Sequence, residues 1–357
     1  MGGYFLSKYN RSKFERWQAN SASSRKLFCI TVPKGDPEAD KNKELKNLIA
    51  PVEILLCNLH AVQDILKGKH ITFEILAAKG LIAFYASVPD RIASLLEKQI
   101  TAQYPDASVE EVDDPNILPG HCATAAIQLA LEKDYVYPIR TYKSFESDSL
   151  NSLTNVLSKL NENMEGAGIQ ICLRPIGDNW QKRSKRIAEA MKSGKFSGDS
   201  LVKGVLEGLG GILIPSIAKD NTRKGVAPEP LTAAQEKIID AVGEKATKPG
   251  FEVVVRVMTA AATNEEAKIN LNNVLSSFGQ YNSSVNRFVI SKLPKAKILT
   301  QFIFRLFSGG RPDILNTEEI ASLWHLPSSR LETPNIKWMR AKRLSPPSNL
   351  PKEGIVL

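Results

Sequence analysis

ITFEILAAKGLIAFYASVP, residues 71–89, contains two β-rich runs that are joined by a short turn. Each run is rich in β-branched and aromatic residues, and Lys79-Gly80 between them is typical of a hairpin turn. Apolar residues of the first run alternate with polar ones, as in a strand with one face in the core. This stretch therefore predicts a β-hairpin whose aromatic side chains are buried: Phe73, Phe84 and Tyr85.

Helices are predicted on both sides of this hairpin. Residues 44–66 carry apolar residues at helical spacing, with Pro51 expected in the first turn of the main helix. Residues 91–104 predict a second helix that Pro105 ends, and the alternating segment 107–112 predicts a further strand. The order of elements in the first half is thus helix, strand, strand, helix, strand.

The second half repeats this order. The elements predicted there are, in sequence, a helix, two strands, a helix and a strand: 149–160, 169–176, 251–260, 265–281 and 286–291. Two copies of one order predict an α+β fold, a duplicated ferredoxin-like (αββαβ) sandwich in which two helices cover one face of each sheet. The predicted units are residues 46–145 and 146–292.

Segments outside these elements complete the predicted organisation. A helical insertion at 177–250 separates the two paired strands of the second unit, because this segment is far too long for a hairpin loop. Residues 1–45 are expected to form a basic N-terminal arm. Residues 293–357 are expected to hold a docking helix and an extended, basic, proline-rich C-terminal connector.

The charge of the chain favours an acidic partner. The sequence has 47 Lys and Arg against 38 Asp and Glu, a formal net charge of +9. Nucleic acid and an anionic membrane surface are the usual partners of such a chain. The N-terminal arm is expected to be solvated and partly disordered, with a surface helix on anionic lipid as the alternative. A solvated helix face is the alternative interpretation of each basic run. The expected nucleic-acid contacts are these: Lys182, Arg183, Lys185, Arg186, Arg340, Lys342 and Arg343.

The sequence contains no recognisable motif for catalysis or nucleotide binding. The glycine-rich segment 208–211 is followed by Ile212 and Leu213, where a Walker A loop needs Lys and then Ser or Thr. G-x-G-x-x-G and G-x-S-x-G are absent too. We therefore expect no catalytic residue, no cofactor, no metal and four reduced cysteines. Cysteine and histidine, the ligand types of a zinc site, occur in two pairs: Cys57 with His60, and His121 with Cys122. Their spacing does not match that of known zinc fingers.

Residues 316–327, NTEEIASLWHLP, predict a short helix with clear ends. Asn316 is a good N-cap, Glu319 can complete a capping box, and Pro327 ends the helix. His325 lies at the C-terminal end, where an imidazole interacts favourably with free carbonyl groups. The helix is interpreted as a docking element that packs against either a partner or the second sandwich unit of the chain itself. Its expected contact residues are apolar: Ile320, Leu323, Trp324 and Leu326.

NTEEIASLWHLP also resembles a segment of the bacterial type IV coupling-protein and HerA-like conjugation ATPases, just before their motor domain. The chain is similar to the N-terminal, non-motor region of these proteins over most of its length outside the arm and the insertion. In that family the connector leads to a Walker A loop, whereas this sequence stops at Leu357, and it lacks the membrane-spanning segments of many relatives. The other stretches that carry the resemblance are APVEILLCNLHAV (50–62), ITFEI (71–75), EKQITAQYPDA (97–107), YPIRTYKSFESDSLNSLTNVLSKL (137–160) and TPNIKWMRAKRLSPPSNLP (333–351).

The resemblance implies a non-catalytic accessory or N-terminal module of a type IV secretion or conjugation-type DNA translocase. Its expected partner is a RecA-like ATPase motor, in cis or in trans. DNA, an anionic membrane surface and a second copy of the chain are further candidates. The implied location is cytoplasmic, at the periphery of the inner membrane. Two alternatives stay open: a stand-alone nucleic-acid-binding protein, and an enzyme in which the cysteines and histidines above converge.

Overall fold

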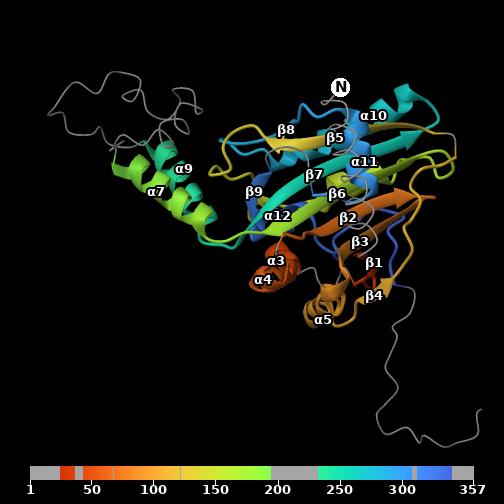
Figure 1. Cartoon of the computed structure of the whole chain (residues 1–357). Coiled ribbons are helices and arrows are strands. Elements are labelled where there is room, and N and C mark those ends of the chain that lie inside the picture. Colours follow the sequence, from red (N-terminus) through yellow and green to blue (C-terminus); the bar gives the residue numbers. More distant parts are fainter. Residues whose placement is uncertain are drawn as a thin grey trace, which may run out of the picture.

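The computed structural model describes residues 25–36, 43–66, 68–120, 122–193, 232–307 and 312–339. These residues form an α+β fold around one nine-stranded antiparallel sheet (Figure 1). The strand order is β4-β1-β3-β2-β6-β7-β5-β8, and β9 pairs with β7. Helices lie on both faces of this sheet. None of the described helices is long and apolar enough to cross a membrane.

The first half of the chain builds one half of the sheet. The predicted hairpin is confirmed, with Lys79 and Gly80 at φ of 52° and 72° in its turn, a conformation that glycine adopts at little cost. The elements are β1 (Arg25–Thr31), α3 (Leu45–Ala61), α4 (Gln63–Leu66), β2 (Ile71–Ala78), β3 (Leu81–Pro89), α5 (Ala93–Gln103) and β4 (Ser108–Glu111).

The chain from β5 onward, here called the second half, adds the remaining strands. β5 itself lies inside the predicted first unit, residues 46–145. Two helices of the predicted insertion, α7 and α9, separate β6 from β7, and the C-terminal part contributes α11, β9 and α12. The elements are β5 (Ala123–Leu131), α6 (Leu150–Leu157), β6 (Gly166–Pro175), α7 (Asn179–Ser193), α9 (Ala233–Lys245), β7 (Gly250–Ala261), α10 (Asn264–Ser277), β8 (Phe288–Ile290), α11 (Lys295–Ile303), β9 (Asp313–Asn316) and α12 (Thr317–Leu323).

Three strands lie where the sequence predicts none: β1, β5 and β9. β9 lies in the predicted C-terminal segment 293–357, directly before α12. β1 lies within residues 1–45, the expected arm. The sequence does not indicate it, because its apolar run is short and begins at basic residues. β5 is alanine-rich, and alanine is depleted in strands, so its composition hides its role. The main helix begins at Leu45, so Pro51 lies inside it and not in its first turn. The remainder of the expected arm, residues 1–24 and 37–42, lies outside the described residues.

The two halves share one sheet, which corrects the prediction of a separate sheet in each unit. β2 and β6 pair along their lengths, from Ile71 opposite Leu173 to Ala78 opposite Gly166. We call this pairing the seam. It joins strands from the two halves by eight residue pairs, so the sheet has no edge at the centre of the molecule.

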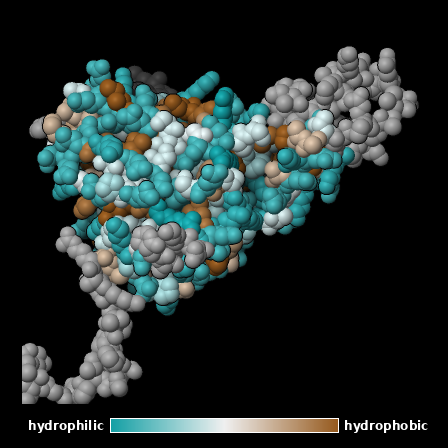
Figure 2. Space-filling model, turned by 180° about the vertical axis from the view of Figure 1, so that it is seen from behind, coloured by the Kyte–Doolittle hydropathy of each residue, from teal (hydrophilic) through white to brown (hydrophobic). Residues whose placement is uncertain are grey.

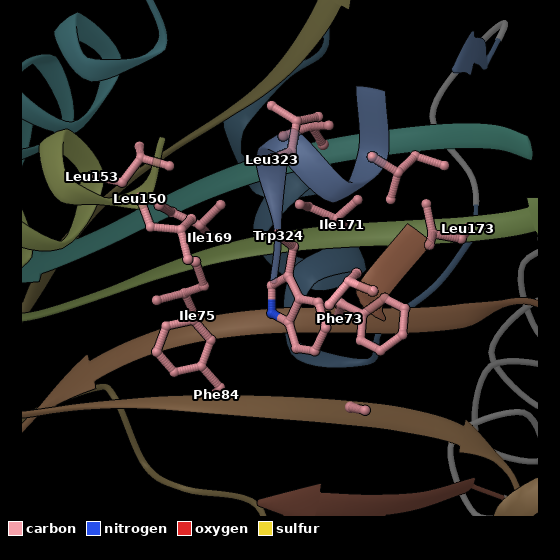
Figure 3. Packing of buried hydrophobic residues seen from close by; sticks show 14 of the residues in the cluster. Phe73, Ile75, Phe84, Leu150, Leu153, Ile169, Ile171, Leu173, Leu323 and Trp324 are labelled. Carbon is pink, nitrogen blue, oxygen red and sulfur yellow. The ribbon is translucent and has the colours of Figure 1, made fainter. Parts of the chain in front are cut away.

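The main hydrophobic core lies between one face of the sheet and helices α3, α5, α6, α10 and α12. Alternate residues of the seam strands point into it, and Figure 3 shows Phe73, Ile75, Ile169 and Ile171 around Trp324, with Leu323 above them. Burial of the three hairpin aromatics is confirmed, although Tyr85 lies on the opposite face of the sheet from the other two. On that opposite face, Ile298 and Phe302 of α11 pack on a second apolar cluster.

Candidate functional site

α12 begins with the capping box that the sequence predicts. The backbone N–H of Glu319 donates to Asn316 Oδ1 at 2.9 Å, and the backbone N–H of Asn316 donates to Glu319 Oε2 at 2.9 Å. The helix ends at Leu323, after which Trp324 adopts an extended backbone. These hydrogen bonds satisfy backbone N–H groups that a short helix leaves free at its start.

The expected docking residues of this segment are all buried inside the chain. Trp324 lies over the seam, where its ring stacks on Phe73 with centroids 4.2 Å apart and its Nε1 donates to the Glu74 carbonyl at 3.3 Å (Figure 3). Ile320, Leu323 and Leu326 are each 2% exposed or less. Their packing is intramolecular, so a partner must bind through other residues.

His325 belongs to a buried hydrogen-bonded cluster that links α12 to α6. Its Nε2 lies 2.9 Å from Asp148 Oδ1, and its Nδ1 donates to the Ala321 carbonyl. Ser328 Oγ and the Leu150 N–H also donate to the Asp148 carboxylate. Burial alone would raise the pKa of Asp148, but His325 and these hydrogen bonds outweigh burial and lower it. With both side chains fully buried, this cluster has no access for a substrate and acts as a structural clamp.

A second buried ion pair ties α12 to α9. Lys245 Nζ lies 3.0 Å from Glu319 Oε2, both side chains are 1% exposed, and the ammonium also donates to the Ile314 carbonyl. Full burial raises the pKa of Glu319, while Lys245 and the N–H groups of Asn316 and Ile139 act in the opposite direction. The base of the insertion is therefore fixed to the helix that the sequence predicted as a docking element.

A buried polar chain crosses the seam on the opposite face of the sheet. Arg256 Nη1 donates to Gln170 Oε1 at 2.9 Å, and Gln170 Nε2 donates to Glu74 Oε1 at 2.8 Å. Arg305 Nη2 completes the chain on Glu74 Oε2 at 3.0 Å, and both Nη atoms of Arg305 bond Asp114. This network is not among the sites predicted from the sequence. The sequence pattern that could have indicated it is the presence of polar residues on otherwise apolar strands, at positions that point away from the core.

The cysteines and histidines do not assemble into a metal site in the described part of the chain. No group of three or more His, Cys, Asp or Glu side chains with suitable geometry is found there. His60 Nε2 bonds the Ile176 carbonyl at 2.8 Å, and Cys57 lies on α3. His121 lies outside the described residues.

In the described part of the insertion, α7 and α9 form an arm that projects from the body (Figure 1). The two helices pack through Ile187, Met191, Ile239 and Val242, and Val136 and Tyr137 of the loop after β5 join this cluster. α9 starts at a complete capping box that Thr232 and Gln235 form. The described part of the arm is thus a packed pair of helices with a small core.

The base of the arm is held by specific contacts. Arg183 donates from Nη1 and Nη2 to the two carboxylate oxygens of Asp134 at 2.8 and 2.9 Å, and its guanidinium stacks 4.9 Å from the Tyr135 ring centre. The hydrogen bonds to Asp134 raise the pKa of Arg183 despite partial burial. Trp180 packs directly on Gly250, at the start of β7. Arg183 is therefore an anchoring residue of the arm.

The other predicted nucleic-acid contacts of the insertion lie on the outer side of α7. Lys182, Lys185 and Arg186 are exposed, and Lys192 continues the same side. Figure 2 shows the arm from behind, with hydrophilic side chains over much of its described surface. Arg340, Lys342 and Arg343 lie outside the described residues, so the structure brings only the α7 residues together.

Comparison with known families gives a match over most of the chain. A family model described as "Domain of unknown function (DUF8128)" matches residues 36–339. The matched range includes α3, the arm and α12. A search of curated proteins finds no match.

Proposed function

The chain belongs to the family described as a domain of unknown function (DUF8128), and we propose that it is a non-catalytic accessory module of a type IV secretion or conjugation-type DNA translocase. In this function it docks beside a RecA-like ATPase motor, in cis or in trans, on the cytoplasmic side of the inner membrane. The sequence resemblance carried by residues 316–327 and the other stretches supplies the kind of partner.

The projecting arm is the observation that carries this proposal. Both faces of the sheet are covered by helices, and the residues of α12 first assigned to docking are used inside the chain. α7 and α9, by contrast, extend away from this body and are anchored at their base (Figure 1). An anchored helical projection suits contact with another macromolecule, because it offers a rigid surface that needs little ordering on binding.

The test combines this chain with RecA-like ATPases of the conjugation type from the same genome, in nuclease-treated samples. We expect one motor to co-elute with the chain in size-exclusion chromatography, and we expect no ATP hydrolysis by the chain alone. Charge reversal on the arm, Lys185→Glu with Arg186→Glu, is expected to reduce co-elution. Failure of every such motor to bind, or ATP hydrolysis by the purified chain, would overturn the proposal.

The finer description of the fold belongs to the same proposal: each half is a copy of one ferredoxin-like unit. The order of elements supports this, since each half runs strand, helix, strand, strand, helix, strand when the arm is set aside. The strand orders β4-β1-β3-β2 and β8-β5-β7-β6 also agree, each being fourth, first, third, second. An experimental structure in which the two halves fail to superpose would refute the duplication.

A stand-alone nucleic-acid-binding protein is the second candidate. The exposed basic side of α7 favours it. This alternative differs from the first in requiring affinity for nucleic acid without any contribution from a motor.

A further inference from the structure

We propose that the outer side of α7 binds the phosphodiester backbone of nucleic acid, and does so without regard to base sequence. The inference names a ligand, nucleic acid, that motor docking in nuclease-treated samples does not require, although both proposals use α7. Either can therefore fail without the other. We call the exposed cations Lys182, Lys185, Arg186 and Lys192 the α7 stripe.

The spacing of the α7 stripe places its charges along one side of the helix. Steps of three, one and six residues keep these side chains on the same side at 3.6 residues per turn. From Lys182 to Lys192 the helix rises about 15 Å at 1.5 Å per residue. One strand of duplex DNA places about four phosphates in that length, at roughly 3.4 Å of helix axis each. Glu189, the only acidic residue of α7 itself, is exposed on the same side and offsets part of this charge.

Three of the four cations are available to a ligand. Lys182 Nζ lies 3.0 Å from Asp178 Oδ2, in an exposed pair that water screens and that contributes little. Lys185, Arg186 and Lys192 make no ion pair with any other described residue within 4.0 Å. Exposed cations without a counter-charge can exchange their mobile counterions for phosphates, and the release of those ions favours binding.

The opposite side of α7 holds the stripe in place. Ile187 and Met191 are buried against α9, and Arg183 is fixed on Asp134 by two hydrogen bonds. The stripe is therefore presented by a backbone that is already ordered, which lowers the entropic cost of binding. Lys and Arg side chains that reach phosphates position a protein on nucleic acid but do not read its bases.

Nucleic acid is favoured over a lipid surface because the described part of the arm has no large exposed hydrophobic side chains. A helix that lies on a membrane inserts an apolar side into the headgroup region. The large hydrophobic side chains that are exposed among the described residues lie elsewhere, for example Ile54 and Ile65 on α3 and α4, and none belongs to α7 or α9. The described surface of the arm thus offers charge without an inserting face.

The test is fluorescence anisotropy of the full chain with labelled duplexes of two unrelated sequences, over about 50 to 200 mM salt. We expect both duplexes to bind with the same affinity, and log K to fall linearly with log salt. The variant Lys185→Gln, Arg186→Gln, Lys192→Gln removes the three cations that form no ion pair with a described residue. Its slope is expected to be smaller by about 2.7, because each phosphate that a cation neutralises contributes about 0.9.

A matched control removes the same charge elsewhere. Lys46, Lys98 and Lys268 are exposed on α3, α5 and α10, so their replacement by Gln changes the net charge equally. We expect this control to keep the slope of the unmodified chain, and circular dichroism to give both variants the same melting temperature. An equal decrease of the slope in the control and the stripe variant would show only a net-charge effect and overturn the proposal.

Two further outcomes would also overturn it. One is the absence of binding to either duplex at the lowest salt. The other is unchanged DNA affinity in the stripe variant together with a loss of binding to phosphatidylserine vesicles, which would assign the stripe to a lipid surface. Neither outcome bears on co-elution with a motor in nuclease-treated samples.

Discussion

Replacement of Trp324 by Ala tests the conclusion that residues 316–327 pack within the chain. Trp324 is 1% exposed, stacks on Phe73 and meets Phe84 edge-on with ring centres 6.3 Å apart. A buried Trp side chain covers about 200 Å², which at about 25 cal/mol per Å² corresponds to roughly 5 kcal/mol. Truncations of buried aromatic residues cost about 3–5 kcal/mol, so we expect the free energy of unfolding to fall by that amount.

The assay is urea unfolding followed by circular dichroism, with two companion variants. Trp338→Ala removes a Trp that is only partly buried at the edge of the same core, and we expect a decrease of about 1–2 kcal/mol. Trp324→Phe keeps an aromatic ring over Phe73 but removes the Nε1 hydrogen bond, so its effect should lie between those of the two alanine variants. A Trp324→Ala chain no less stable than Trp338→Ala would refute the packing argument. If that chain also failed to bind a partner, Trp324 would be a docking residue after all.

Other buried contacts lead to three more predictions. Asp148→Asn removes a carboxylate whose pKa is lowered by His325. The stability that this carboxylate contributes is present above about pH 4 and is lost as the pH falls through the lowered pKa. The difference in urea midpoint between the variant and the unmodified chain should therefore shrink in acid, and a constant difference would contradict this. Lys245→Met leaves the Glu319 carboxylate buried without its ammonium and should cost about 3–5 kcal/mol, while Lys245→Met with Glu319→Gln should cost less than the single change, as measured by thermal unfolding. Gly250→Ala places a Cβ 2.6 Å from Trp180 Cζ2 and should destabilise the chain by about 1–3 kcal/mol, whereas Gly243→Ala, with open space around its Cβ, should not lower the melting temperature.

The sequence predicts the elements that local chemistry determines. The hairpin at 71–89 and the capping box of Asn316 and Glu319 depend on residues close together in the chain, and both are confirmed. β5 depends on strands far away in sequence, because its alanines are suitable for a strand only between β7 and β8. The pairing of β2 with β6 joins strands about a hundred residues apart, and no periodicity within either strand encodes it.

The candidate site shows the same division between local pattern and distant contact. The spacing of Ile320, Leu323 and Trp324 correctly marks an apolar face. The same face would serve a partner protein or the chain's own core, and only the position of the seam decides between them. The basic residues of α7 are equally ambiguous in sequence. Only the structure shows that Arg183 binds Asp134, whereas Lys185 and Arg186 remain exposed.

The contacts at the base of the arm have a consequence for any ligand of α7. α9 ends at Lys245, whose ammonium is buried against Glu319 of α12. Trp324, directly after α12, packs over the seam. On the other helix, Arg183 binds Asp134 in the loop that follows β5. The arm is therefore attached to the sheet at two separate points, one on each helix, so it cannot swing about a single hinge without breaking a buried ion pair, at a cost of about 3–5 kcal/mol. A nucleic acid or motor bound to α7 would accordingly be held at a fixed position relative to the sheet, which is the property that a positioning module requires.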